Sequence, residues 1–86
     1  MHKNREDILY SITMILHKLE LINNANVLNE NTGLLGRGVG MDSVEVLQMV
    51  AAIEDEFDLT IDDEDLLPIH FSTVSHLITF IERRLS

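Results

Sequence analysis

The sequence contains no cysteine and no tryptophan, and its 86 residues include a single proline. Without cysteine the chain cannot form a disulfide framework, and it cannot hold a thioester on its own side chains. Any thiol chemistry would therefore depend on an attached group. A chain of this length forms one small domain with little interior for an enclosed catalytic site. We expect a single domain over residues 1–86 that is not an enzyme.

Basic residues are scarce as well: six Lys and Arg face fifteen Asp and Glu, which gives a formal net charge of −9. Nucleic-acid binding requires Lys and Arg to displace counterions, so we expect no nucleic-acid partner. Ten acids and no base lie between positions 42 and 65. Such a run is often only a solvated face, but it also favours basic protein partners. The charge favours a monomer.

Long apolar runs are absent too. No stretch reaches the roughly 18 apolar residues of a membrane span, and residues 1–7 lack the apolar run of a secretory signal. We expect a cytoplasmic protein without membrane insertion.

A metal site is not expected either. The four histidines (His2, His17, His70 and His76) are scattered, and no cysteine can complete a zinc site. The acid run 58–65 lacks the glycine that an EF-hand loop needs. At most, these acids would bind cations weakly and without specificity.

Apolar residues recur at helical spacing in three segments, at about 5–22, 43–57 and 73–85. Asn4 is a candidate N-cap for the first, and Ser72 or Thr73 for the last. Residues 62–67 could form one or two helical turns before Pro68 interrupts them. The sequence predicts an all-α fold, a small four-helix bundle of three main helices and one short helix.

Residues 23–41 break the helical pattern and contain all four glycines of the chain, Gly33, Gly36, Gly38 and Gly40. We expect a long loop between the first two helices. Its anchors to the core would be Val27, Leu28, Leu34 and Leu35. A phosphate-binding P-loop is excluded, because the Gly-Lys-Ser/Thr ending is missing.

The segment 43–57 has two apolar faces when it is drawn as a helix. The core face would consist of Val46, Met49, Val50, Ile53 and Phe57. Val44, Leu47 and Ala51 lie well over a right angle away, with Glu54 and Asp55 beside them. An apolar centre with an acidic rim is typical of a transient protein interface. The alternative is that these three residues pack under the long loop.

The junction between the loop and this helix reads Gly40-Met41-Asp42-Ser43-Val44, and Ile53-Glu-Asp-Glu-Phe57 follows downstream. Together these segments resemble the acyl carrier protein family, which has a Gly-x-Asp-Ser-Leu-like motif at the head of its second helix. The resemblance covers most of the chain. It implies that Ser43 receives 4′-phosphopantetheine from coenzyme A, with Asp42 and Gly40 as motif residues.

Helix physics agrees with this resemblance, because the positive end of a helix dipole suits a phosphodiester. The alternative is that Ser43, or Asp42, is an ordinary N-cap.

The resemblance also implies a partner-binding face. The positions that match it are Asp42, Val44, Glu45, Leu47, Ala51, Glu54 and Asp55. The implied partners are a phosphopantetheinyl transferase and acyl-loading and acyl-using enzymes with basic docking patches. Gln48 stands where many members have an acid, and Val44 replaces the usual leucine. These departures favour a specialised pathway over the housekeeping fatty-acid carrier.

The resulting hypothesis is a carrier that holds acyl or aminoacyl intermediates as thioesters on an arm at Ser43, for fatty-acid, polyketide or related biosynthesis. Two alternatives stay open: a peptidyl or D-alanyl type of carrier, and an acidic helical adaptor that is never modified.

Overall fold

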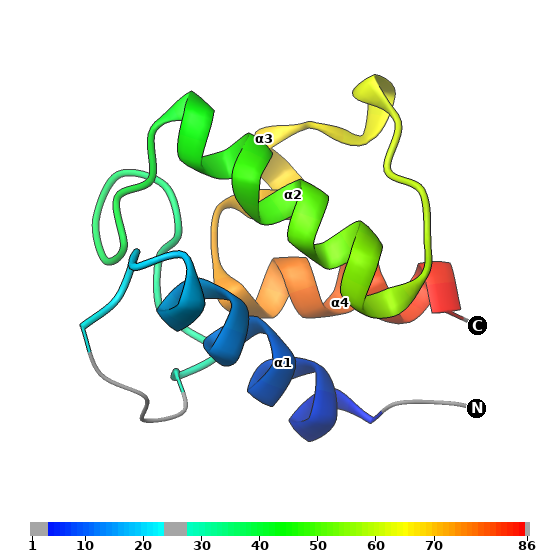
Figure 1. The fold of residues 1–86 in the computed structure, drawn as a ribbon, viewed down its shortest axis with the longest axis horizontal. Helices are drawn as coiled ribbons and strands as arrows, with labels where there is room; N and C mark the ends of the chain where they lie inside the picture. Colours follow the sequence, from blue (N-terminus) through cyan, green and yellow to red (C-terminus); the bar gives the residue numbers. More distant parts are fainter. Residues whose placement is uncertain (1–3, 24–27, 86) are drawn as a thin grey trace.

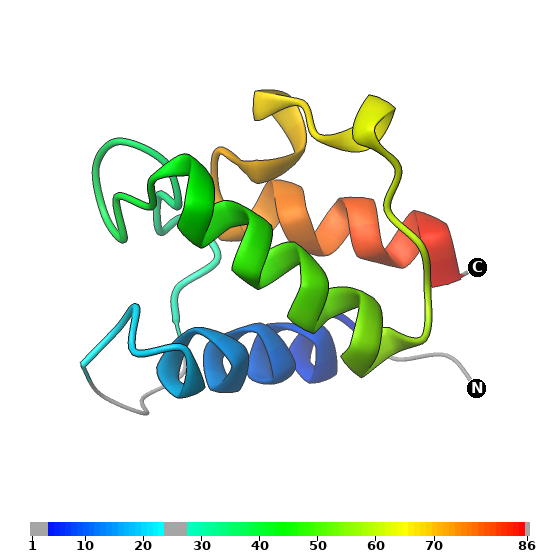
Figure 2. The same cartoon turned by 45° about the horizontal axis from the view of Figure 1, so that its top comes forward.

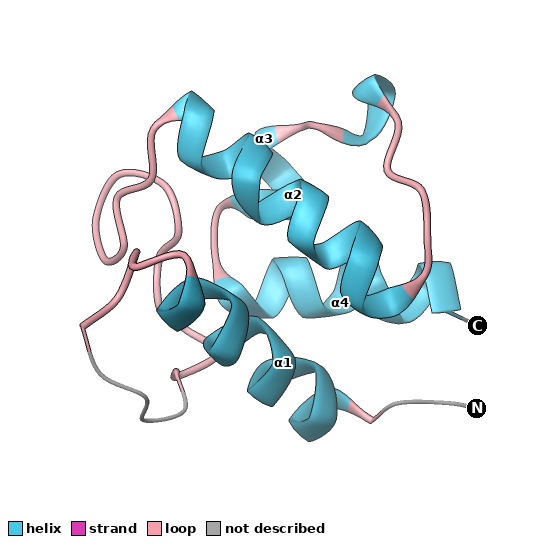
Figure 3. Cartoon of the chain, in the orientation of Figure 1, coloured by secondary structure: helices cyan, strands magenta, loops and turns pink. Residues whose placement is uncertain are grey.

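A computed structural model describes residues 4–23 and 28–85, and it is helical, as the sequence predicts (Figure 1). Three long helices are α1 (Arg5–Lys18), α2 (Ser43–Phe57) and α4 (Val74–Leu85). Between α2 and α4 lie a 3₁₀ turn, η1 (Asp63–Asp65), and the short α3 (Pro68–Phe71). Figure 3 shows the loops that join them, the longest between α1 and α2.

The three long helices enclose one apolar core. α1 packs against both α2 and α4, and α3 packs against α4 (Figure 2). Each long helix contributes the apolar stripe that its spacing predicts. The largest fully buried side chains of these helices are Ile8, Ile12, Leu16, Met49, Ile53, Leu77, Ile78 and Ile81.

The predicted N-caps of the first and last helices are confirmed. The side chain of Asn4 accepts a hydrogen bond from the Asp7 N–H at 2.8 Å. Thr73 Oγ1 accepts one from the His76 N–H at 3.2 Å. Each bond satisfies one amide that the first turn of a helix leaves without a partner.

The prediction that the first helix reaches residue 22 was wrong, because α1 ends at Lys18. Glu20 takes a left-handed conformation with φ of 62°. The Leu21 N–H then bonds to the Leu16 carbonyl at 2.9 Å, and the Glu20 N–H to the His17 carbonyl at 3.0 Å. This is a Schellman ending. The left-handed residue of such an ending is usually a glycine. Here it is Glu20, so the sequence carried no signal for it.

The expectation for Pro68 was also wrong. Only one 3₁₀ turn forms before it, at η1, and Pro68 begins α3 instead of interrupting a helix. Proline suits the first helical position, where its fixed φ is already helical and its missing N–H would have no partner.

The long loop is fastened to the start of α4. The Leu34 N–H bonds to the Ser72 carbonyl at 2.9 Å, and the Val74 N–H to the Thr32 carbonyl at 3.0 Å. Leu34 is fully buried, while Leu28 and Leu35 are half-buried against the core. Val27, the fourth expected anchor, lies outside the described residues. The loop therefore approaches α2 from a fixed position.

Candidate functional site

The amino end of α2 is capped by Asp42 and not by Ser43. The Glu45 N–H bonds to Asp42 Oδ1 at 2.8 Å, and the Asp42 N–H bonds to Glu45 Oε1 at 3.0 Å. This reciprocal pair is a capping box. Ser43 is the first helical residue, and it is exposed. Its hydroxyl is therefore not needed as the cap, which removes that alternative for Ser43 and keeps it for Asp42.

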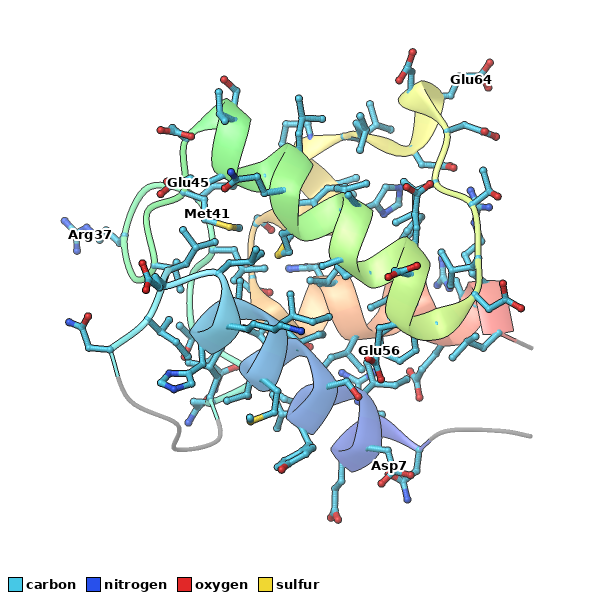
Figure 4. All side chains as sticks on the ribbon, in the orientation of Figure 1. Asp7, Arg37, Met41, Glu45, Glu56 and Glu64 are labelled. Carbon is cyan, nitrogen blue, oxygen red and sulfur yellow. The ribbon has the colours of Figure 1, made fainter. Side chains whose placement is uncertain are left out.

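The backbone before Ser43 is held by Gly40 and Met41. Gly40 has φ of 66°, and a Cβ there would lie 2.9 Å from the Gly36 carbonyl oxygen. Met41 is buried in the core, and its N–H bonds to the Leu34 carbonyl at 2.9 Å. Figure 4 shows Met41 and Glu45 between the loop and the start of α2. Sequence reasoning gave Met41 no role. Its burial and its hydrogen bond fix the backbone just before the cap residue Asp42.

An apolar groove of about 300 Å³ begins at Ser43. Its walls come from the loop, from α2 and from the segment that leads into α3. The lining residues besides Ser43 are Leu35, Val46, Leu47, Leu66, Leu67, Pro68 and Phe71. Sequence reasoning missed the last four. The signal available was the apolar run Leu66-Leu67-Pro68-Ile69, in which Leu67 and Ile69 stay exposed.

The second apolar stripe of α2 is uncovered. Val44 is 62% exposed, Leu47 is 55% exposed, and Ala51 is exposed as well. The alternative, in which these residues pack under the long loop, is wrong. Leu47 also lines the groove, so the stripe and the groove meet at this residue.

The acids expected around this stripe differ in their surroundings. Asp42 and Asp55 are exposed. Glu45 is half-buried and belongs to the capping box. Glu54 is half-buried, and its Oε2 accepts a hydrogen bond from the Ile61 N–H at 2.8 Å. Glu54 therefore also holds the segment that follows α2.

No histidine of the described residues lines the groove. His70 packs its ring against Phe80, with centroids 4.7 Å apart, and His76 sits at the start of α4 beside Thr73. His2 is outside the described residues. Over residues 4–23 and 28–85, no three His, Asp or Glu side chains gather as possible metal ligands. No helix in the described part of the chain is long and apolar enough to cross a membrane.

Residues 12–81 match the family model described as a phosphopantetheine attachment site. The chain belongs to the acyl carrier protein family of phosphopantetheine-binding domains. The prosthetic group of this family is covalently attached 4′-phosphopantetheine. An exposed hydroxyl at a helix start, next to an apolar groove, fits such a group.

Three curated relatives are similar to parts of the chain. An acyl carrier protein of Exiguobacterium sp. is 45% identical over 47 residues, covering 55% of this chain and 57% of the relative. One of Phaeodactylum tricornutum is 42% identical over 48 residues, covering 56% and 60% respectively. A mitochondrial acyl carrier protein of Neurospora crassa is 29% identical over 69 residues, covering 80% of this chain and 51% of the relative. The chain thus spans between half and three-fifths of the length of these relatives.

Proposed function

We propose that this carrier holds acyl or aminoacyl intermediates as thioesters on a 4′-phosphopantetheine arm attached to Ser43 Oγ, and that it catalyses no reaction itself. The observation that carries this proposal is that the cap of α2 and the candidate attachment site are two different residues. Asp42 supplies the cap, so the exposed Ser43 hydroxyl is available for modification. The chain has no cysteine, and the arm, when attached, supplies the thiol that forms the thioester.

The chain's own residues favour a phosphate at this position. The Ser43 and Val44 amides precede the first helical hydrogen bond, which runs from the Val46 N–H to the Asp42 carbonyl. They lie at the positive end of the helix dipole, which stabilises an anion. The carboxylates of Asp42 and Glu45 repel a phosphate, so we expect it to project away from them, toward the groove.

The groove suits the apolar part of the arm or its cargo. Its walls are mainly apolar side chains, among them the buried Phe71. Apolar surface gains about 25 cal/mol per Å² when it is removed from water. Apolar parts of an arm that starts at Ser43, or of the cargo at its end, would therefore be stabilised along Leu47, Leu66 and Leu67.

The uncovered stripe of α2 is our proposed partner-binding face. Val44, Leu47 and Ala51 form its apolar centre, and Asp42, Glu45, Glu54 and Asp55 supply its negative charge. Charges at the rim of an interface steer encounters and set their specificity. The partners would be a phosphopantetheinyl transferase and acyl-loading and acyl-using enzymes with basic patches. We propose a monomer in the cytoplasm.

The cargo would be chosen by the enzyme that loads it. Fatty-acid and polyketide biosynthesis are the pathways we favour. The Gln48 and Val44 departures support a specialised pathway within that range. A peptidyl or D-alanyl carrier uses the same attachment chemistry.

Intact-mass measurement after incubation with coenzyme A, magnesium and a broad-specificity phosphopantetheinyl transferase tests the attachment. We expect one phosphopantetheine mass gain in the natural chain, none in Ser43→Ala, and an undiminished gain in the control Ser11→Ala. An unchanged mass of the natural chain would favour the unmodified adaptor, and a gain retained in Ser43→Ala would contradict attachment at Ser43.

The partner-binding face is tested by the initial rate of the same reaction. Leu47→Asp and Asp55→Lys should each slow it about tenfold, equivalent to ~1.4 kcal/mol of transition-state binding, with unchanged far-UV circular dichroism. Asp7→Lys is the matched control, because Asp7 is exposed at the far end of α1 (Figure 4). Equal rates in all three variants would show that the face is misassigned.

A further inference from the structure

Residues 58–67 connect α2 to α3 and supply part of the lining of the groove. The connection passes the carboxyl end of α4 and then crosses to α3 (Figure 2). Leu66 and Leu67 at its far end line the groove beside Ser43. The position of this connection therefore decides how closely the groove is walled.

A single side chain, Arg84 of α4, is bonded to both ends of the stretch 60–65. Its Nη2 forms an ion pair with Asp65 Oδ2. Its Nη1 donates to the Thr60 carbonyl at 3.2 Å. Its guanidinium also lies 5.2 Å from the centroid of the Phe80 ring, a cation–π distance.

The anchor of Arg84 is itself part of the packed structure. Phe80 is buried, and its ring packs against His70 at 4.7 Å and Phe71 at 6.0 Å between centroids. Phe71 lines the groove. One cluster of contacts thus runs from the connection, through Arg84 and Phe80, to Phe71 in the lining of the groove.

Other contacts also hold the connection, and its Leu59 and Leu66 are half-buried against the core. Ile61 is buried, and its N–H bonds to Glu54 of α2, which fixes the near end. Beyond it, the Asp65, Leu66 and Leu67 N–H groups bond to carbonyls of Asp62, Asp63 and Asp65, all inside the connection. These bonds preserve the shape of the turn but not its place on the protein.

The negative charge of the connection makes its ion pair with Arg84 more important for keeping it against α4. The connection carries four consecutive acids, from Asp62 to Asp65, in a chain of net charge −9. Excess charge of one sign destabilises a compact arrangement through self-repulsion. Without the Arg84 guanidinium, the repulsion among these four carboxylates would lose the ion pair that offsets it.

We propose that Arg84 is a positioning residue that holds residues 60–67 against α4, and so sets how far Leu66 and Leu67 shelter the cargo carried at Ser43. This inference rests on the proposed function, because it requires the arm at Ser43. Releasing Arg84 lets the wall move outward, and a sheltered thioester then becomes more accessible to water and to small nucleophiles.

The test uses the full chain loaded from octanoyl coenzyme A, with hydroxylamine as a small nucleophile that cleaves the thioester. Cleavage is followed by intact mass, with free octanoyl-pantetheine as the reference. We expect the natural chain to slow cleavage, and Arg84→Gln to speed it roughly fivefold relative to the natural chain, the factor for losing ~1 kcal/mol. Arg37→Gln, which removes the same charge from an exposed position in the loop, should behave like the natural chain.

A second variant and a second measurement guard against a folding artefact. Asp65→Asn removes the ion pair from the other side and should speed cleavage in the same direction. Hydrogen exchange of residues 59–67 should accelerate in Arg84→Gln, while exchange in α1 stays unchanged. The charge-swapped double variant Asp65→Arg/Arg84→Asp should regain part of the protection.

Three results would overturn the inference: no protection in the natural chain, equal cleavage in Arg84→Gln and the natural chain, or equal acceleration by Arg37→Gln. Failure of the proposed function can be told apart from failure of this inference. In that case the chain gains no mass at Ser43 during loading, before any cleavage is measured.

Discussion

Single residues in the loop before Ser43 differ sharply in what their backbone tolerates. Gly38 has φ of 90°, and a Cβ there would lie 2.3 Å from the Gly33 carbonyl oxygen. Gly36 has φ of 68°, but a Cβ there would meet nothing within 4 Å. Both positions carry the cost of a left-handed conformation, about 1–2 kcal/mol for a residue with a side chain. Only Gly38 adds a clash with backbone.

We therefore expect Gly36→Ala to lower the free energy of unfolding by about 1 kcal/mol, and Gly38→Ala to lower it by clearly more. Urea denaturation of the two variants and the natural chain measures the difference. Equal losses of unfolding free energy would mean that the loop rearranges around the new Cβ without a further loss of stability. The loop would then not fix the backbone that leads to Ser43.

The Asp65 carboxyl gives a pH dependence with a defined sign. Its hydrogen bond to Arg84 holds the pKa of Asp65 below the ordinary value of 3.8, and the backbone N–H of Asp62 acts in the same direction. A lowered folded pKa contributes stability that is fully present above the unfolded value and is lost as pH falls through the folded value. The attachment of residues 60–65 should therefore weaken only in strong acid.

Carboxyl titration followed by NMR checks this assignment. In Arg84→Gln the pKa of Asp65 should rise toward its ordinary value, because the largest cause of the shift is gone. In Arg83→Gln it should stay lowered. A titration of Asp65 that is the same in all three proteins would show that the ion pair is absent in solution.

At the scale of elements, the cap of α2 and the partner-binding face share one residue, Asp42. Asp42→Ala removes the side chain that accepts the Glu45 N–H, and losing such a cap costs about 1 kcal/mol. Asp42→Asn keeps an acceptor oxygen there, so it should unfold like the natural chain. Both variants remove the same charge. Thermal unfolding should separate them, whereas slower loading by the transferase should affect both alike.

If Asp42→Asn loads at the natural rate, the Asp42 charge has no part in partner binding. Its role would then be the cap alone.

The elements that the sequence predicts best are those with local signals. Both ends of α2 were predicted correctly, because apolar residues recur at helical spacing over residues 43–57. The capping box of Asp42 and Glu45 was found only in the structure. The end of α1 was missed because Glu20 adopts a conformation that its residue type does not announce. Pro68 was misread because proline ends some helices and begins others.

The candidate site likewise has parts that could be predicted from local sequence signals and parts that could not. The exposed stripe of α2 followed from helical spacing within one element. The groove did not, because Leu66, Leu67 and Pro68 come from a segment without periodicity. The attachment of Arg84 could not be predicted either, because its partners Asp65 and Thr60 lie 19 and 24 positions away in the chain.

On the scale of the whole molecule, two arginines are engaged outside α2, by bonds between other parts of the fold. Arg5 joins three parts of the fold: it bonds to Glu30 of the loop and to Glu82 of α4 at 2.6 Å each, and to Thr79 at 3.1 Å. These bonds raise the pKa of Arg5, the Glu30 bond most. Arg84 is likewise engaged at the end of α4. The exposed stripe of α2 faces solvent with acids around it and no Lys or Arg within the helix.

This distribution predicts opposite effects of salt on stability and on loading. Raising the salt from about 0.01 M to about 1 M shortens the Debye length from roughly 30 Å to roughly 3 Å. The self-repulsion of a chain with net charge −9 is then screened, so the thermal midpoint should rise. Loading by a transferase with a basic patch should slow over the same range, because its long-range attraction to the acids is screened.

Thermal unfolding and initial loading rates, measured in the same salt series, check both halves of this prediction. Asp55→Lys provides the control: it should flatten the salt dependence of loading, because part of the attraction is already gone, whereas Asp7→Lys on the far end of α1 should leave it nearly as steep. A midpoint that falls with salt would mean that the ion pairs of Arg5 and Arg84 contribute more than the repulsion among the acids costs. In that case salt should also weaken the hold of Arg84 on residues 60–67, and speed the cleavage of a sheltered thioester.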